Sequence, residues 1–367
     1  MGELKIKKEK IYLVLENGAY FAGDTFGGDF ETVYGEVVFI TSITGYLESI
    51  TDPSYCGQIL VQTFPLIGNY GVIPEDFESE RPWLSGYIVR DWCETPSNYR
   101  STQRLDEYFK KENIPAMSGI DTRRLTRIIR NNGVMNGMLT KKAPPYSNEE
   151  LEKIKEYTCA AVVNRVTRKE AKVYESENPK YNVVLWDFGT KENITRCLTQ
   201  RGCNVTVVPA DTKAEEIKSL NPDGIILSNG PGDPQENKGV IEELKKVCEY
   251  KIPIFGICLG HQLLALSQGA ETEKLKYGHR GANQPVKDLS CGRVYISAQN
   301  HGYAVVDSSL PEHGKLSFIN MNDGSCEGIK YTKFPAFSVQ FHPEACAGPL
   351  DTMWLFDDFI KLIEENK

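Results

Sequence analysis

One cysteine stands between two glycines directly after an apolar run, and this segment constrains the fold more than any other. The run 252–255 predicts a short buried strand, and the apolar positions of 262–266 predict one face of a helix. A residue at the apex of a tight strand-to-helix turn has strained backbone angles, so its neighbours two positions away must be small. Gly256 and Gly260 hold those positions around Cys258. The segment therefore predicts an α/β sheet that presents a nucleophilic cysteine at a helix N-terminus, where the helix dipole favours the thiolate.

Length and composition narrow the class of protein further. A chain of 367 residues is too long for one ordinary hydrophobic core and predicts about two domains. The formal net charge of -8 gives no indication of a nucleic-acid surface. The 10 cysteines include no CxxC pair, which favours reduced thiols and a cytoplasmic location. The 5 histidines form no cluster with cysteine at ligand spacing, and no apolar stretch approaches a membrane span, so we predict neither a metal site nor a membrane partner.

The pattern of secondary structure changes twice along the chain. Residues 1–145 contain short β-rich runs broken by Gly and Pro, with two helical stretches, which predicts a mixed α/β domain with much antiparallel character. The polar, Lys- and Glu-rich segment 146–180 predicts a linker that contains one or two helices. In 181–367, strands alternate with amphipathic helices, which predicts a three-layer α/β domain around a parallel sheet.

Two loops of this second domain are expected to meet at one edge of the sheet. The apolar strand 224–227 runs directly into the glycine-rich loop 228–234, and the Cys258 turn also follows a strand. Ligands of open parallel sheets bind at the carboxyl ends of the strands, so we expect both segments there. The backbone N–H of Leu259 and those of the glycine-rich loop are candidate donors to a tetrahedral oxyanion.

A histidine and a glutamate end another predicted strand. The apolar run 337–341 leads into His342, Pro343 and Glu344. An imidazole can manage the protons of a thiolate nucleophile, and a carboxylate can fix the tautomer of that imidazole. Residues two apart project to the same side of an extended chain. We therefore predict that Cys258, His342 and Glu344 form a catalytic triad for attack on a carbonyl.

Six stretches of the chain resemble known families. Four of them resemble the triad-type, class I glutamine amidotransferases: GICLGHQ at 256–262, SNGPGDP at 228–234, QNHGYAV at 299–305 and FHPEA at 341–345. In the first domain, GEVVFITSITGYLESITDPSY at 35–55 and SGIDTRRLTRIIR at 118–130 resemble the small, glutamine-hydrolysing subunit of carbamoyl-phosphate synthetase. The resemblance extends over nearly the whole chain.

The resemblance assigns roles to individual residues. It implies that Cys258 forms a glutamyl thioester, that His342 is its acid/base partner, and that Glu344 orients the imidazole. It implies an oxyanion hole formed by Leu259 and Gly230. The implied contacts to glutamine are Ser54, Gly230, Gly232, Leu259, Gln262, Asn300, Gly302 and Tyr303. Tyr303 stands where the commonest family pattern has Phe, which leaves a backbone contact possible. Two other histidines near these motifs, His261 and His301, are expected to serve packing or hydrogen bonding, and His279 and His313 are given no role.

The resemblance also implies a reaction and a partner. Glutamine is hydrolysed to glutamate and ammonia, and the ammonia passes to a large synthetase subunit. That subunit uses bicarbonate, ATP and Mg to make carbamoyl phosphate for arginine or pyrimidine synthesis, or both. No GxxxxGK[ST] motif is present, so we expect no cofactor in this chain and a heterodimer, or a larger assembly, with the partner.

Three alternatives account for part of the sequence. A stand-alone cysteine hydrolase does not explain Gln262, the 299–302 loop or the first domain. An amidotransferase subunit of another synthase does not explain the stretches in the first domain. A non-catalytic regulatory scaffold does not need the intact Cys258, His342 and Glu344.

Overall fold

The computed structural model describes residues 9–367, which divide into two compact units. The first unit ends at Cys159 and the second begins at Ala160, but the short segment Asp52–Ser54 belongs to the second unit. The division after Cys159 falls inside the predicted linker. Helix α4 (Asn148–Lys155) precedes this division and α5 (Val162–Val166) follows it.

The first unit is built on a closed β-barrel. Its strands β3, β4, β6 and β8 are parallel neighbours, and β9, β1 and β2 complete the ring by antiparallel pairing. Parallel neighbours need crossover connections, which α1 (Tyr46–Thr51) provides between β3 and β4, and α2 (Leu105–Lys111) between β6 and β8. In order around the barrel the strands are β1 (Lys10–Leu15), β2 (Tyr20–Thr25), β8 (Ala116–Ser118), β6 (Gly86–Ile88), β4 (Gln58–Gln62), β3 (Thr32–Ile40) and β9 (Met135–Thr140). A separate parallel pair joins β5 (Leu66–Ile67) to β7 (Asp91–Trp92).

Apolar residues on both faces of these strands are buried. Val38 of β3 packs in a cluster with residues of α1 and α2, whereas its neighbour Val37 packs in a second cluster. Helix α3 (Thr122–Asn132) contributes Leu125 and Ile129 to that second cluster. Asp121 caps this helix, because its side chain accepts a hydrogen bond from the Arg124 N–H at 2.9 Å.

The second unit contains a 10-stranded sheet. Strands β12, β11, β13, β14 and β19 are parallel neighbours, in agreement with the predicted parallel sheet. The prediction did not include the antiparallel part, in which β18, β17, β15 and β16 extend one edge and β10 pairs with β12 at the other. In sheet order the strands are β10 (Lys172–Tyr174), β12 (Cys203–Pro209), β11 (Tyr181–Asp187), β13 (Gly224–Leu227), β14 (Ile254–Ile257), β19 (Ala336–Val339), β18 (Cys326–Tyr331), β17 (Gly314–Asn320), β15 (Thr272–Asp288) and β16 (Val294–Val305).

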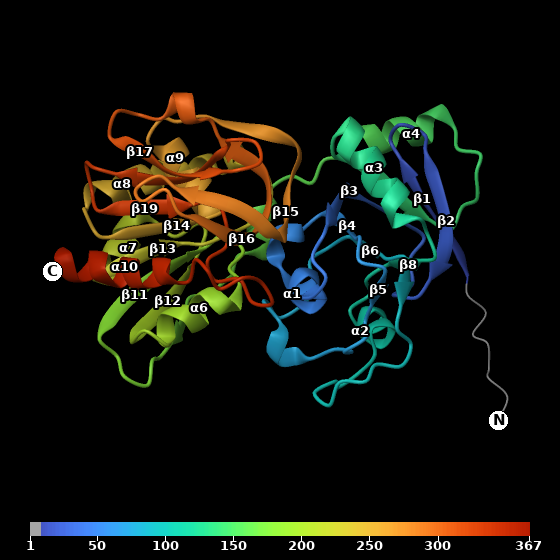
Figure 1. Cartoon of the computed structure of the whole chain (residues 1–367), viewed down its shortest axis with the longest axis horizontal. Helices are drawn as coiled ribbons and strands as arrows, with labels where there is room; N and C mark the ends of the chain where they lie inside the picture. Colours follow the sequence, from blue (N-terminus) through green and yellow to red (C-terminus); the bar gives the residue numbers. More distant parts are fainter. Residues whose placement is uncertain (1–8) are drawn as a thin grey trace. The chain divides into compact units, whose positions relative to one another are not determined.

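Helices cover both faces of the parallel part of the sheet and complete the predicted three layers (Figure 1). Val184 and Trp186 of β11 face a cluster that includes residues of α7 (Ala214–Ser219), α8 (Lys238–Glu249) and α9 (Leu259–Ser267). Val183 and Leu185 face the other cluster, with α6 (Glu192–Thr199) and α10 (Trp354–Glu365). The period-two alternation along β11 therefore divides its side chains between two cores.

Two further features concern the chain as a whole. All 10 cysteines are free, as predicted from their spacing. Within residues 9–367, no helix combines the length and the apolar character that crossing a membrane would require.

Candidate active site

Cys258 lies at the apex of the turn between β14 and α9. Its backbone has φ 53° and ψ −104°, a left-handed conformation that a residue with a side chain rarely adopts. A Cβ on Gly256 would lie 2.9 Å from the Gly260 carbonyl oxygen, and a Cβ on Gly260 would lie 2.3 Å from the Leu227 carbonyl oxygen. Both glycines are therefore required by close backbone contacts, as the sequence predicts. The Cys258 N–H donates to the Val339 carbonyl at 2.9 Å, which ties the turn to β19.

The glycine-rich loop after β13 lies beside this turn. The Gly260 N–H donates to the Ser228 carbonyl at 2.9 Å, and a Cβ on Gly230 would meet the Leu259 side chain at 2.7 Å. Among the described residues, no acceptor is hydrogen-bonded to the backbone N–H of Gly230 or of Leu259. Both groups predicted as oxyanion donors are thus adjacent and available.

His342 and Glu344 form a buried pair. The His342 Nδ1 lies 2.7 Å from Glu344 Oε1, and the side chains are 1% and 0% exposed. His342 forms an isolated antiparallel bridge with Ala298 after β19, whereas Pro343 and Glu344 lie in a turn, so the chain is not extended through Glu344 as the sequence prediction assumed. Because Nδ1 donates to the carboxylate, the lone pair of the neutral ring is on Nε2, which has no hydrogen-bond partner in the described part of the chain.

Charges in this pair depend on one another. Burial and the Lys191 ammonium oppose protonation of His342, but Glu344 and Cys258 outweigh them and raise its pKa to about 9. Burial opposes ionisation of Glu344, but Lys191 and His342 outweigh it and lower its pKa to about 2. An imidazolium stabilised by Cys258 is the partner that a thiolate nucleophile requires.

Lys191 is a charged residue of this site that the sequence prediction missed. Its Nζ donates to Glu344 Oε1 at 3.1 Å, lies 3.1 Å from His342 Nδ1, and is 3.8 Å from Asp52 Oδ2. Lys191 follows β11 at the carboxyl edge of the parallel strands, as Cys258 follows β14. Such sheets bind ligands at that edge, but a position after a strand does not by itself single out Lys191 in the sequence.

Ser54 and Asn300 are brought to the same site by two partners that were also missed. Asn229 Nδ2 donates to Ser54 Oγ at 3.0 Å, and Asn300 Nδ2 donates to Asp52 Oδ2 at 3.0 Å. Asn229 is fully buried. Cys258 Sγ lies 3.8 Å from the Asn300 carbonyl oxygen, which places these groups close to the thiol.

The remaining predicted contacts lie around α9 and β16. Gln262 Nε2 donates to the Tyr303 carbonyl at 2.8 Å and to Gln340 Oε1 at 2.9 Å, so this amide holds the end of β16 that carries Gly302. Gly232 has φ +89°, and a Cβ there would lie 2.3 Å from Val162 Cγ2. The structure therefore groups Gln262, Gly302 and Tyr303 on one side of the site and Gly232 in the loop that also supplies Gly230.

Comparisons with known proteins place the chain in a family. Residues 13–139 match the model of the carbamoyl-phosphate synthase small chain, CPSase domain, and residues 184–362 match glutamine amidotransferase class-I. The carbamoyl phosphate synthase small chain of Syntrophotalea carbinolica is 49% identical over 98% of this chain and 99% of that protein. The small chain of Clostridium perfringens is 50% identical over 96% of this chain and 99% of that protein. The chain belongs to the carbamoyl phosphate synthase small chains.

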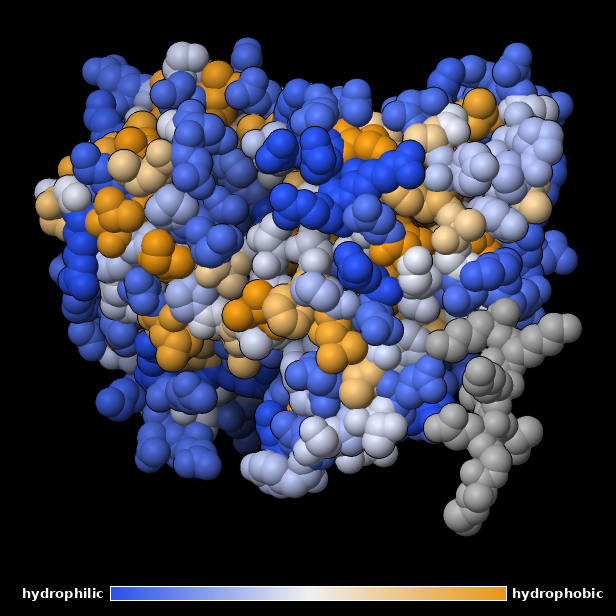
Figure 2. All heavy atoms as spheres, turned by 45° about the vertical axis from the view of Figure 1, so that its right-hand side comes forward, coloured by the Kyte–Doolittle hydropathy of each residue, from blue (hydrophilic) through white to orange (hydrophobic). Residues whose placement is uncertain are grey.

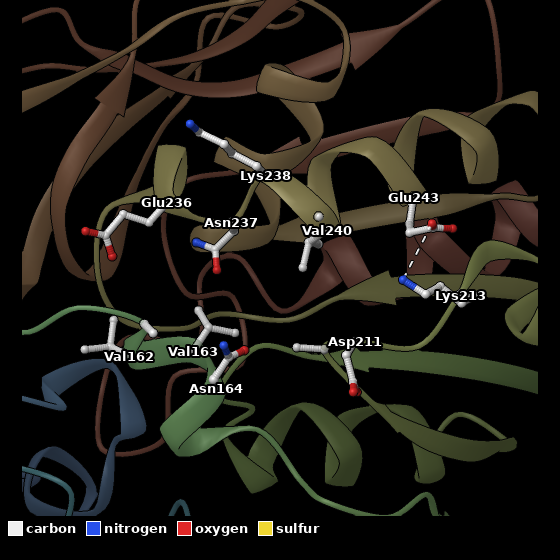
Figure 3. Close-up of a pocket in the computed structure, with 13 residues that line it drawn as sticks. Val162, Val163, Asn164, Asp211, Lys213, Glu236, Asn237, Lys238, Val240 and Glu243 are labelled. Atoms are coloured by element: carbon white, nitrogen blue, oxygen red, sulfur yellow. Dashed lines mark ion pairs between the residues drawn. The ribbon is translucent and has the colours of Figure 1, made fainter.

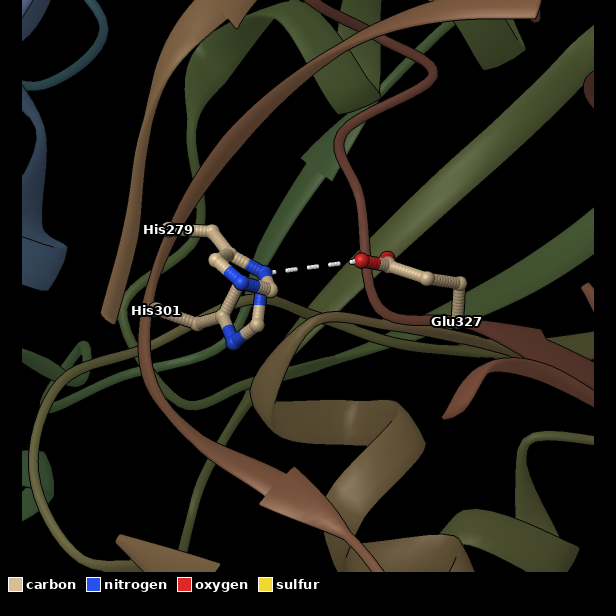
Figure 4. Close-up of side chains that lie close together, drawn as sticks. All are labelled: His279, His301 and Glu327. Atoms are coloured by element: carbon tan, nitrogen blue, oxygen red, sulfur yellow. Dashed lines mark ion pairs between the residues drawn. The ribbon is translucent and has the colours of Figure 1, made fainter. Parts of the chain in front are cut away.

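Two histidines of this small chain lie in a buried polar group near the site (Figure 4). Ligand atoms of His279, His301 and Glu327 all lie within 4.8 Å of one another, an arrangement that the sequence spacing did not indicate. Hydrogen bonds engage these atoms. His301 Nδ1 donates to the Tyr303 carbonyl at 2.7 Å, and Glu327 Oε1 accepts from Gln299 at 2.9 Å. His279 Nε2 lies 2.8 Å from Asp323 Oδ2.

We interpret this group as a network that supports β16 around Asn300, a stretch that the sequence analysis treated as a loop. His301 thereby has the hydrogen-bonding role expected from the sequence, and so does His261, whose Nδ1 lies 2.8 Å from Ser338 Oγ. Burial lowers the pKa of His261 to about 3. His279 was given no role from the sequence. Burial opposes its protonation, but Glu327 and Asp323 outweigh burial and raise its pKa.

A pocket of about 230 Å³ lies elsewhere in the second unit, between α5, the loop after β12 and the start of α8 (Figure 3). Its lining includes Asn164, Asp211 and Asn237, and Lys213 and Glu243 form an ion pair at 3.8 Å within it. None of the predicted site residues lines this pocket. We assign it no ligand.

Proposed function

We propose that this chain hydrolyses L-glutamine to glutamate and ammonia and delivers the ammonia to a large synthetase subunit that makes carbamoyl phosphate. The observation that carries the proposal is Cys258 on a strained turn at the N-terminus of α9, with the buried His342–Glu344 pair after the neighbouring parallel strand β19. Membership of the small-chain family supports the choice of glutamine and of the partner subunit.

The residues of the site account for the first half of the reaction. The Cys258 thiolate attacks the side-chain amide carbon of glutamine, a C–S bond forms, and the electrons of the C=O π bond move onto oxygen to give a tetrahedral oxyanion. The N–H groups of Leu259 and Gly230 donate to this oxyanion. The His342 imidazolium then donates its Nε2 proton to the amide nitrogen, and the C–N bond breaks. Ammonia is released, and a glutamyl thioester remains on Cys258.

In the second half, water replaces the amide nitrogen. Neutral His342 accepts a proton from the water as it attacks the thioester carbon, and the C–S bond breaks to give glutamate and the thiolate. Glu344 keeps the ring oriented and stabilises the imidazolium in both halves. We assign the contacts to the glutamine backbone and side chain to Ser54, Gly230, Gly232, Leu259, Gln262, Asn300, Gly302 and Tyr303.

The remaining chemistry belongs to the partner. We propose that the chain itself uses no cofactor, and that ATP, Mg and bicarbonate are bound by the large subunit in a heterodimer or a larger assembly. The product would serve arginine or pyrimidine synthesis, or both. The 10 free cysteines support a reducing, cytoplasmic location.

Substitution of the nucleophile tests the proposal. Cys258→Ala should abolish glutamine-dependent carbamoyl phosphate synthesis by the complex, because no thioester can form, while synthesis from added ammonia continues. The measurement is carbamoyl phosphate formation with glutamine and, separately, with ammonium chloride. Cys291→Ala provides a matched control, because Cys291 is exposed and is not among the residues assigned to the site. A Cys258→Ala chain that still hydrolyses glutamine at the wild-type rate would contradict the assignment.

A further inference from the structure

Three arginines of the first unit line one open depression of about 640 Å³. They are Arg123, Arg127 and Arg130 of α3, and the rest of the lining is Thr41, Thr63 and Thr126. The arginines are spaced i, i+4 and i+7, so they project from one face of the helix. We call this set the α3 arginine face. All three arginine side chains are exposed.

The positive charge of this face has no counter-charge among residues 9–367. Among the described residues, no ion pair or side-chain hydrogen bond is made by Arg123, Arg127 or Arg130, and no acidic residue lines the depression. Two of the threonine hydroxyls in the lining already donate to backbone carbonyls: Thr63 Oγ1 to Ile40 and Thr126 Oγ1 to Thr122. Like charges one helical turn apart repel, so this face is stabilised when an anionic group binds to it.

Apolar side chains next to the depression indicate that the anionic group belongs to a protein. Ile43 is 68% exposed and lies two residues from Thr41, and Phe64, directly after Thr63, is 37% exposed. Leu66 is 41% exposed. Arginine and aromatic residues are enriched in protein interfaces, whereas a site for a free anion needs no exposed apolar surface. Figure 2 shows one face of the molecule, on which hydrophilic and apolar side chains alternate in small patches.

We propose that the α3 arginine face, with Ile43 and Phe64 beside it, binds a carboxylate-bearing surface of the large synthetase subunit. This inference rests on the proposed function, because that function supplies the partner. Asp and Glu side chains match the planar guanidinium groups, which can bind a carboxylate through two parallel hydrogen bonds. In a chain of net charge -8, three unpaired arginines form a local positive surface, and its attraction for acidic side chains offsets the repulsion from the rest of the chain.

Charge reversal in the full-length chain tests the inference. Arg127→Glu should weaken binding to the separately purified large subunit about tenfold, and the Arg127→Glu/Arg130→Glu chain should bind still more weakly. The dissociation constant is measured by titration calorimetry at low and at physiological salt. Wild-type binding should weaken as salt increases, and the double variant should show a smaller dependence, because fewer ion pairs remain to be screened.

A matched control comes from the same helix. Arg124 is exposed on α3 but does not line the depression, and its guanidinium lies over the Phe21 ring, 5.3 Å from the centroid. Arg124→Glu changes the charge by the same amount and should leave the dissociation constant within about twofold of wild type. Arg127→Gln removes the charge without reversing it and should give an intermediate loss, which keeps the test valid if a reversed chain folds poorly.

The outcomes separate this inference from the function on which it rests. Wild-type affinity in the Arg127→Glu/Arg130→Glu chain, or an equal loss in Arg124→Glu, would overturn the docking surface and leave glutamine hydrolysis in place. Binding of inorganic phosphate that depends on Arg127, with unchanged affinity for the large subunit, would show a free-anion site instead. If the wild-type chain does not bind the large subunit at all, the proposed function fails together with the inference.

Discussion

At the scale of single residues, the charge state of His342 depends on two neighbours that act in opposite directions. Glu344 raises the pKa of His342 and Lys191 lowers it, with a net result of about 9. The proposed mechanism needs the imidazolium to protonate the departing nitrogen. His342 is protonated below its pKa, so the imidazolium is present at neutral pH and is lost as the pH rises through about 9.

The pH profile of glutamine hydrolysis should show this dependence. We expect kcat/KM to fall on the basic side near pH 9 in the wild-type complex. Glu344→Gln should move this limb to lower pH, because the group that raises the pKa of His342 is lost. Lys191→Met should move it to higher pH, because the group that lowers the pKa is lost. Basic limbs that coincide in all three proteins would show that His342 is not the titrating group.

At the scale of elements, the position of Cys258 depends on how closely α9 approaches β13. Gly260 lies in the first turn of α9, where an added Cβ would meet the backbone of Leu227 at 2.3 Å. Backbone cannot rotate away as a side chain can, so the helix has to shift. A shift of α9 moves the Leu259 N–H and the cysteine together.

Gly260→Ala should therefore lower both stability and activity. We expect the free energy of unfolding to fall by about 1–3 kcal/mol, the usual cost of overpacking, and glutamine hydrolysis to fall with it. The control is Gly239→Ala in α8, where a Cβ meets nothing within 4 Å. Alanine should leave that helix unchanged or stabilise it by about 0.5–1 kcal/mol. Chemical denaturation and a glutaminase assay on both variants provide the measurements, and equal effects would contradict the packing argument.

The same scale shows what sequence patterns predict well. The segments with Cys258, His342 and residues 228–234 follow β14, β19 and β13, which are parallel neighbours, so the rule that parallel strands end at one edge applies to all three. Lys191 follows that rule too, but a lone lysine after a strand has no distinctive neighbours in sequence. Its role depends on a 3.1 Å contact with Glu344, which lies 153 positions away.

At the scale of the whole molecule, long-range pairing limits prediction from sequence. The β-rich runs of the first unit were predicted, but their closure into a barrel depends on pairing β2 with β8 and β3 with β9, across gaps that local patterns do not encode. The antiparallel edge of the second sheet was missed for the same reason. Alternation of apolar and polar residues along β15 or β16 does not determine which strand each of them pairs with. Segment Asp52–Ser54 was assigned to the first domain by its position in the sequence, yet it belongs to the second unit.

Because Asp52–Ser54 belongs to the second unit, a fragment that begins at residue 160 lacks part of that unit. A fragment of residues 160–367 retains both hydrophobic clusters of the second unit, so we expect it to unfold cooperatively. It lacks Asp52 and Ser54, which leaves the buried amides of Asn300 and Asn229 without their partners. Water or a shifted side chain must then replace those hydrogen bonds, at a cost of about 1–3 kcal/mol for each unsatisfied group.

The expected result is a KM for glutamine at least about tenfold higher in the fragment than in the full chain, because the glutamine contacts lose their support. An Asp52→Ala/Ser54→Ala variant of the full chain should show a similar increase, and it tests the same contacts if the fragment folds poorly. Circular dichroism melts and glutaminase kinetics on both proteins provide the comparison. A wild-type KM in the double variant would mean that Asn300 and Asn229 hold their positions without this segment, and that the second unit binds glutamine with residues 160–367 alone.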